Sequence, residues 1–446
     1  MRVSLLVPSL LTTAAFLGGA CGNTVITTSG TASGPGGSTS AASTSVAKSS
    51  SHVVSATGTG GGPDIGQPSD VYPAPHPSQP TVETAGGAIL SSPVIIPVFF
   101  KGENPTTVAA MTKFASDIGG TAYWTATTSE YGVGPAKGLP AIQLTETATG
   151  TIDDSQIQTW LAGKLNANDP LFPTPDANTL FEIYYPTGVH ITLSDGMGGV
   201  EQSCFQFGAY HNSITLDAAH GSASVAYAVM PHCSHFGMLT GLDALSGPTS
   251  HEIIEAVTDP YPMTNTAYGQ EDQAHAFWQF AIGGGEVGDM CAQEMNAFSS
   301  FPGLDNQAQR TWSNKSAAAS HDPCVPVDMS FPYFNAVPVL PDTISLGGGF
   351  NTKGVKIPVG TSRTIDIKLF SDGPTGGPFN VDVVEDTQIL GGPNLDLSLD
   401  ASAGQNGQTL HLTITANAST QFQAELFTLH ASLNGYEHTW VGLVGN

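Results

Sequence analysis

The chain has 446 residues, of which 40% are hydrophobic, so it is long enough for two or three domains with packed cores. Only 11% of the residues are charged, while 52 glycines and 31 prolines favour a secreted, loop-rich, β-containing structure over a helical bundle. The formal net charge of −25 argues against nucleic acid or anionic lipid as a partner, because both require cationic patches, and it is compatible with binding cations.

The N-terminus, residues 1–21, is typical of a bacterial lipoprotein signal peptide. Arg2 precedes the apolar segment LLVPSLLTTAAFL, and the small residues of LGGAC place Cys21 at the position that would be lipidated. Cleavage without lipidation is the alternative. No later segment has about 18 consecutive apolar residues. We therefore expect an exported protein at the bacterial cell surface or outer membrane, attached to the membrane only through a lipid anchor, or else secreted.

Residues 22–86 consist mainly of Ser, Thr, Gly, Pro and Ala, with few large apolar side chains. Such a segment cannot bury enough surface to offset the entropy lost on ordering, so we expect a disordered tether.

Residues 87–327 alternate between strand-like and helix-like patterns. An apolar β-rich run, AILSSPVIIPVFF, is followed by two helical segments, NPTTVAAMTKFASDI and DDSQIQTWLAGKLN. TLFEIYYPTGVHITL is expected as a pair of strands, and CFQFGAYHNSITL and VAYAVMP as further strands. A short helix then follows SGP and ends at Pro260. This order predicts an α+β domain with a mixed sheet backed by helices.

Residues 328–446 show a different pattern. Seven or eight short segments, among them TIDIKLFSD and TLHLTITA, alternate apolar and polar residues with turn residues between them. This spacing predicts an all-β sandwich of immunoglobulin-like type. We expect this domain to be a spacer or a binding module.

Four cysteines remain when Cys21 is set aside. In an exported chain, Cys204, Cys233, Cys291 and Cys324 predict two disulfides, for which three connectivities are possible. We favour Cys204–Cys233 and Cys291–Cys324, because each pair closes a local loop. A zinc–cysteine site is disfavoured because no two cysteines have C-x-x-C spacing.

The segment SHEIIEAVTDP carries the strongest functional pattern. At about 100° per residue, His251, Glu252, Glu255 and Asp259 share one arc of a helix, while apolar residues fill the opposite arc. His251 and Glu255 lie one turn apart, so both can reach one cation. The pattern resembles the H-E-x-x-H zinc helix with Glu255 in place of the second histidine.

A tetrahedral catalytic zinc requires a third protein ligand and one open position. The glycine-rich segment GGGEVGDMC offers Glu286 and Asp289, which we place first, and His211 comes next. Glu252 lies where a general base would take a proton from water. His211, or Tyr210 beside it, would then steady the oxyanion.

A structural interpretation of the same helix is also open. Thr249 and Glu252 have the spacing of a capping box, with Pro248 near the first helical position, and acidic residues in a first turn stabilise a helix without any metal.

Together, HEIIEAVTDP, GEVGDMC and RTWSN followed by DPCVP resemble the Exordium-like, phosphate-induced protein family and its bacterial relatives. YWTATTSEYG and AYHNS also resemble that family, and the similarity covers roughly residues 90–327. The resemblance implies a zincin-like core in a cell-surface protein. It carries the motif positions over to five residues, which are His251, Glu252, Glu255, Glu286 and Asp289.

We therefore expect a surface-anchored, zinc-dependent hydrolase of metallopeptidase type that acts on a peptide or protein substrate. His251, Glu255 and one of Glu286 or Asp289 would hold the zinc, with calcium as the alternative ion because Glu255 adds a hard oxygen ligand. The alternative is a non-catalytic surface protein in which a structural metal or a polar cluster braces the same helix. Nothing in the sequence indicates which oligomeric state the protein adopts.

Overall fold

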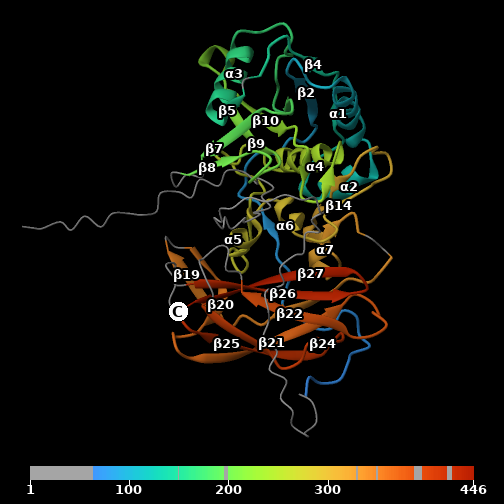
Figure 1. Ribbon diagram of the computed structural model, residues 1–446, viewed down its shortest axis with the longest axis vertical. Coiled ribbons are helices and arrows are strands. Elements are labelled where there is room, and N and C mark those ends of the chain that lie inside the picture. The colour runs from blue at the N-terminus through green and yellow to red at the C-terminus, as the bar shows by residue number, and fades with distance from the viewer. Residues whose placement is uncertain are drawn as a thin grey trace, which may run out of the picture.

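Figure 1 shows the computed structural model as two stacked units, an α+β unit and a two-sheet β unit. The structure describes residues 64–148, 150–194, 199–327, 330–347, 350–385, 394–418 and 424–445. The expected signal peptide with Cys21, and residues 22–63 of the expected tether, lie outside the described residues. None of the helices in the described part is long and apolar enough to cross a membrane.

The α+β unit is built on a mixed sheet of six strands in the order β3, β2, β6, β10, β9, with β4 also paired to β2. β2, β6 and β10 run parallel, and β9 is antiparallel to β10. β6 is buried along its whole length, as is usual for a central parallel strand. The strands are β2 (Val94–Phe99), β3 (Lys137–Gly138), β4 (Ile142–Gln143), β6 (Thr179–Tyr185), β9 (Tyr210–Thr215) and β10 (Ser224–Pro231).

Helices cover both faces of this sheet, because alternate strand residues point to opposite sides. Ile95 and Phe99 of β2 lie in the core that includes α1 and α4, whereas Ile96 and Val98 lie in the core that includes α3. The expected combination of a mixed sheet and backing helices is therefore present. The helices are α1 (Pro105–Ile118), α2 (Ala122–Thr128), α3 (Asp154–Asn166) and α4 (Asp243–Thr258).

Helix α4 is longer than the sequence predicts. It begins at Asp243, five residues before Pro248, which lies inside the helix. Thr249 is therefore an interior residue, so the capping box expected with Glu252 does not form. The prediction was wrong because Pro248 was taken as a helix start, although the buried Ala244 and Leu245 already belong to the helix.

Short strands and helices form the loops around the main sheet. The two strands expected in TLFEIYYPTGVHITL are present as β6 and β7, but they belong to different sheets and do not pair with each other. The remaining elements of this unit are β5 (Thr151–Asp153), β7 (His190–Ser194) and β8 (Val200–Gln202) in one sheet; the pairs β1 (Val82–Glu83) with β13 (Gln270–Glu271), β11 (His235–Phe236) with β12 (Leu239–Thr240), β14 (Phe298–Ser299) with β15 (Ala308–Gln309), and β16 (Thr311–Trp312) with β17 (Cys324–Val325); the helices α5 (Trp278–Ile282), α6 (Asp289–Ala292) and α7 (Asn314–Ala318); and two 3-10 turns, Ser129–Tyr131 and Ala218–His220.

The C-terminal unit consists of two packed sheets, so the expected β-sandwich is confirmed. One sheet has the order β18, β21, β25, β23, and the other β19, β20, β27, β26, β22, β24. Along β25, every second residue is buried, which is the period-two pattern that the sequence showed. The strands are β18 (Phe334–Pro338), β19 (Asp342–Gly347), β20 (Phe350–Lys356), β21 (Ser362–Ser371), β22 (Phe379–Glu385), β23 (Leu395–Leu399), β24 (Ala403–Gly404), β25 (Thr409–Ala416), β26 (Ala424–Leu433) and β27 (Tyr436–Gly445).

Residues 64–86 correct the expected extent of the tether. They run along the sandwich and then along the α+β unit: Ala74 N donates to Asn406 Oδ1, and Val82 in β1 pairs with Glu271 in β13. Ala74 and Val82 are buried. Composition suggested disorder here because the segment has few apolar residues. Ala74 and Val82 are nevertheless buried against the two units, and hydrogen bonds to both units hold the segment in place.

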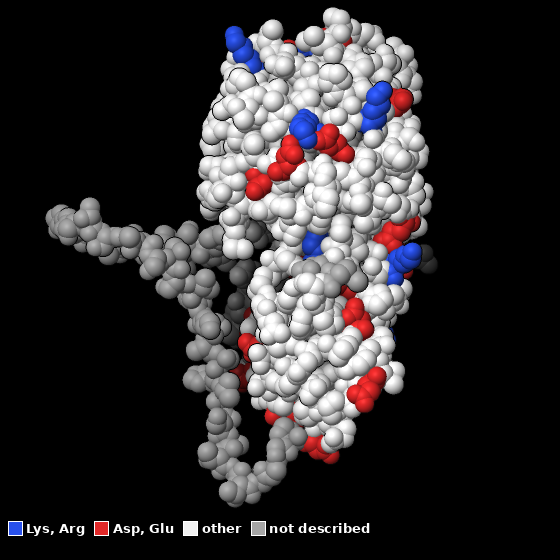
Figure 2. Space-filling view, turned by 90° about the vertical axis from the view of Figure 1, so that its right-hand side faces the viewer, with Lys and Arg blue, Asp and Glu red and all other residues white. Residues whose placement is uncertain are grey.

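Both expected disulfides are present, Cys204–Cys233 and Cys291–Cys324. Two disulfides are typical of a protein that folds in an oxidising, extracytoplasmic compartment. Figure 2 shows a surface on which charged side chains are sparse, with acidic groups scattered over both units.

Candidate metal centre

The polar arc of α4 points away from the apolar core and meets the loop that carries α6. His251 Nε2 lies 2.9 Å from Glu255 Oε2 and 3.7 Å from Asp289 Oδ1. One ligand atom from each of these three residues lies within 4.8 Å of the other two. All three side chains are buried. The helix therefore offers two candidate ligands one turn apart, as the spacing of the motif predicted, and α6 offers Asp289 as a third.

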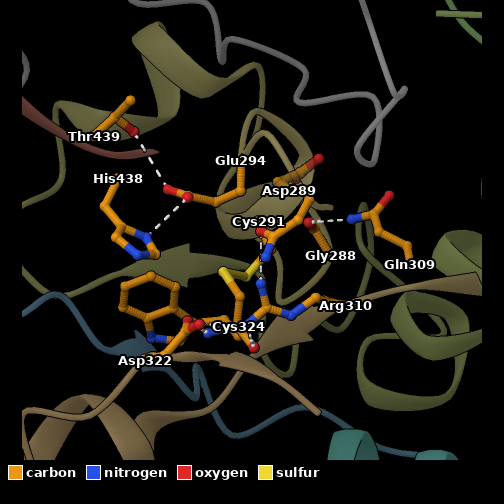
Figure 3. The surroundings of a disulfide bond; sticks show 12 residues. Gly288, Asp289, Cys291, Glu294, Gln309, Arg310, Asp322, Cys324, His438 and Thr439 are labelled. Atoms are coloured by element: carbon orange, nitrogen blue, oxygen red, sulfur yellow. Dashed lines mark hydrogen bonds and ion pairs between the residues drawn. A yellow bond between two sulfur atoms is a disulfide. The ribbon is translucent and has the colours of Figure 1, made fainter. Parts of the chain in front are cut away.

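Backbone amides fix the orientation of Glu255. Its Oε1 accepts hydrogen bonds from Gly288 N and Asp289 N, both at 3.0 Å, which leaves Oε2 directed towards His251. Figure 3 shows Gly288, Asp289 and Cys291 on one short segment, with the side chain of Gln309 beside it. The loop thus orients one ligand and contributes another.

Glycines allow this loop to approach so closely. A Cβ atom on Gly288 would lie 2.7 Å from Glu255 Oε1 and 2.8 Å from His251 Nδ1. A Cβ atom on Gly284 would lie 1.9 Å from Asp289 Oδ2. The expectation that the glycine-rich segment approaches the helix agrees with this geometry.

We expect Gly288→Ala to weaken zinc binding at least tenfold and to cost about 1–3 kcal/mol of stability, because the added methyl must displace Glu255 or His251. Zinc titration and thermal unfolding would measure both effects. The control is Gly163→Ala in α3, where a Cβ would meet no atom within 4 Å. That change should add about 0.5–1 kcal/mol of stability and leave zinc binding unchanged. Equal zinc affinity in the two variants would contradict the interpretation that Gly288 must lie close to Glu255 and His251 for zinc to bind.

Gln309, which the sequence did not single out, fixes the tautomer of His251. Its Nε2 donates to Gly288 O at 2.7 Å, and a carbonyl can only accept, so Gln309 Oε1 must face His251 Nδ1, 3.0 Å away. His251 Nδ1 therefore carries the proton, and in the neutral ring Nε2 presents its lone pair to Glu255 and Asp289. This is the outer-shell arrangement usual for a metal-binding histidine.

We expect Gln309→Leu to lower zinc affinity about 10- to 100-fold, because the histidine loses the acceptor that holds its tautomer and ring orientation. Gln309→Glu should retain more of the affinity than Gln309→Leu, since a protonated carboxyl group can accept from His251 Nδ1 and donate to Gly288 O as the amide does. Equilibrium dialysis with zinc would compare the two variants. If both bound zinc as wild type does, Gln309 would have no part in orienting His251.

His211 lies on β9 on the same sheet face as α4 and forms a second group of ligand atoms. Its Nδ1 lies 3.2 Å from Glu252 Oε2 and 3.8 Å from Glu255 Oε2, and its Nε2 donates to Asp259 O at 3.1 Å. Burial lowers the pKa of His211, but the hydrogen bond to Glu252 and the nearby carboxylates outweigh burial, so the pKa is raised. His211 is thus brought to Glu252, the expected general base, and also lies near Glu255, which belongs to the group around His251 as well.

Two other expected residues are placed differently. Glu286 Oε1 lies 3.6 Å from His211 Nε2, and Glu286 N donates to Asp289 Oδ2 at 3.2 Å, so Asp289 and not Glu286 belongs to the group around His251. Tyr210 alternates with His211 along β9 and points to the opposite face, where its hydroxyl donates to Asp154 Oδ1 at 2.6 Å. Its expected role as an oxyanion helper is therefore wrong.

The charges in the cluster are unbalanced. Among the described residues, the ion-pair partners of Glu252, Glu255 and Asp289 are the histidines His211 and His251, and no Lys or Arg pairs with these three. Burial, and then the charge of Glu255, raise the pKa of Asp289 well above its usual range. Such a group of buried carboxyls requires either protons or a cation for stability.

Glu271 is a further buried acid that the sequence analysis missed. It pairs through its backbone with β1, and within the described residues neither of its carboxyl oxygens has a hydrogen-bond partner. Burial raises its pKa well above the usual range, with Asp289 and Asp272 adding to the effect. A Cβ on Gly285 would lie 2.9 Å from Glu271 Oε2, so the glycine-rich loop also covers this side chain. No sequence motif surrounds Glu271, so sequence reasoning alone had no signal that could identify this residue.

No protein-family model and no curated protein matches this chain. Among solved structures, domains 4 and 5 of the S-layer protein SbsC align at 17% identity and a TM-score of 0.17, covering 26% of this chain and 54% of that one. A titin domain aligns at 14% identity and a TM-score of 0.15, covering 21% of this chain and 85% of that one. The chain thus spans about half of the S-layer fragment.

Proposed function

We propose that the protein is an exported, zinc-dependent hydrolase with a zincin-like core, a bacterial relative of the Exordium-like family, and that its substrate is a peptide or protein. The observation that carries the proposal is the buried group of His251, Glu255 and Asp289, in which neighbouring groups orient both His251 and Glu255. The immunoglobulin-like sandwich would serve as a spacer or binding module.

The mixed set of one imidazole and two carboxylates suits zinc better than calcium. Calcium takes six to eight oxygen ligands, whereas zinc is held by three protein ligands that include histidine when a catalytic position stays open. Bound zinc would supply Lewis-acid polarisation of a substrate carbonyl and of water. His251, Glu255 and Asp289 are the residues that would hold it.

Glu252 is the residue we assign to proton transfer. It follows His251 on α4, and its Oε2 is 3.2 Å from His211 Nδ1, while its Oε1 has no hydrogen-bond partner among the described residues. One oxygen is thus oriented by His211, and the other remains able to accept a proton from water. Because His211 contacts Glu252 directly, its role is to position the base rather than to steady an oxyanion.

A non-catalytic metal centre is the second candidate, and burial is the observation that favours it. His251, Glu252 and Glu255 are all 0% exposed. A structural zinc with a closed ligand shell would brace α4 against the glycine-rich loop. Cleavage of a substrate separates the two candidates, since both contain metal.

Metal analysis of the purified full-length protein tests the centre itself. We expect bound zinc, and we expect chelation to lower the unfolding temperature by several degrees, because an ion present at 1,000 times its dissociation constant stabilises the folded state by about 4 kcal/mol. Zinc should restore the original temperature and calcium should not. Protein that is free of metal and unaffected by the chelator would overturn the proposal for both candidates.

A further inference from the structure

We infer that His211, Glu252 and Glu255 form a second site for a divalent cation, which shares Glu255 with the proposed zinc centre and therefore rests on that proposal. The ligand atoms of the cluster fall into two groups of three, His251 with Glu255 and Asp289, and His211 with Glu252 and Glu255. The atoms within each group lie within 4.8 Å of one another. All three residues of the second group are buried.

The tautomer of His211 suits a ligand at this position. A backbone carbonyl can only accept, so His211 Nε2 carries the proton that is donated to Asp259 O. In the neutral ring, Nδ1 then presents a lone pair to Glu252 Oε2 at 3.2 Å and Glu255 Oε2 at 3.8 Å. Three electron-rich atoms thus face one another, which is favourable only with a proton or a cation between them. Each histidine of the cluster is held in the same way through its other nitrogen.

The carboxylates also have capacity for a further ion. Among the described residues, Glu252 Oε1 and Glu255 Oε2 accept no hydrogen bond, although both side chains are fully buried. Glu255 Oε1 already accepts hydrogen bonds from two backbone amides. Oε2 is therefore the oxygen that the His251 group and the His211 group share. A carboxylate between two metal positions is typical of two-metal sites, whose ions lie about 3.5–4 Å apart.

A cation bound at this second site would prevent Glu252 from acting as the general base. A cation coordinated by Glu252 removes the carboxylate that would accept a proton, so excess zinc is expected to inhibit the hydrolase. The ligand set of one nitrogen and two carboxylates suits zinc or a similar transition-metal ion.

The test is a zinc titration of the chelator-treated full chain, with bound metal measured after equilibrium dialysis. We expect two zinc ions per wild-type chain, the second at least tenfold weaker than the first. His211→Ala should bind one zinc ion with the affinity of the tighter site. The control is His411→Ala, which removes a surface imidazole 2.7 Å from Asp400 and should leave the count at two.

Each outcome bears on a different claim. One zinc ion in both wild type and His211→Ala overturns the second site but leaves the proposed centre intact. One zinc ion whose affinity falls in His211→Ala shows a single centre that includes His211, and also overturns it. No zinc in the wild type overturns the proposed function as well. If His211→Ala does not fold, cobalt(II) substitution of the wild type decides: a spin-coupled signal at two equivalents supports the shared carboxylate, and uncoupled cobalt contradicts it.

Discussion

Glu252→Gln is expected to lower hydrolysis about 10²- to 10⁴-fold, the usual contribution of a general base. The amide has nearly the same shape as the carboxyl and can still bond to His211, but it cannot accept a proton from water. His251, Glu255 and Asp289 are unchanged, so the zinc that we propose they hold should remain. Cleavage of a peptide library followed by mass spectrometry, together with zinc analysis of the same sample, measures both effects.

The matched control for this substitution is Glu425→Gln. Glu425 is also buried, but it lies in strand β26 of the sandwich, where it accepts a hydrogen bond from Asn394 Nδ2 at 2.7 Å. We expect this variant to cleave as wild type does. If Glu252→Gln cleaved the library as fast as Glu425→Gln, Glu252 would not be the base. If wild type cleaved nothing while holding zinc, the non-catalytic centre would be favoured.

The parts of the site that could be predicted are those that depend on local spacing. His251 and Glu255 are four residues apart on a helix, so any helical conformation brings them to one face. The pairing of cysteines was predictable for the same reason, since each pair closes a loop of modest length. Asp289 was among the candidates because a glycine-rich segment can approach another segment of the same chain closely.

The parts that could not be predicted depend on tertiary contacts. Gln309 is a single amide in a short strand, and only the fold places it between Gly288 and His251. Tyr210 and His211 are neighbours in sequence, yet strand alternation directs them to opposite faces of the sheet. The start of α4 was misjudged because Pro248 is tolerated inside a helix that packs on all sides. Tertiary packing decides the place of Gln309 and the start of α4, whereas the separation of Tyr210 from His211 follows from strand alternation, and the fold decides only which face meets α4.

Removal of the disulfide between Cys291 and Cys324 is expected to affect both stability and zinc binding. The Cys291→Ala, Cys324→Ala double variant opens a loop with a sequence separation of 33, which should cost about 3–4 kcal/mol of unfolding free energy. Asp289 lies two residues before Cys291 in α6, and the disulfide ties α6 to β17 (Figure 3). Without this tie the ligand is less constrained, so we also expect zinc affinity to fall about tenfold.

The second disulfide supplies a control with nearly the same chain entropy. Cys204 and Cys233 are 29 residues apart, and the loop-closure difference from the first bond is only about 0.1 kcal/mol. The Cys204→Ala, Cys233→Ala variant should therefore lose a similar amount, about 3–4 kcal/mol, of unfolding free energy measured by denaturant. It should keep its zinc affinity, because neither cysteine lies in α4 or α6. An equal fall in zinc affinity in both variants would trace the effect to global destabilisation. A fall confined to the Cys291–Cys324 pair would show that this disulfide holds Asp289 at the metal centre.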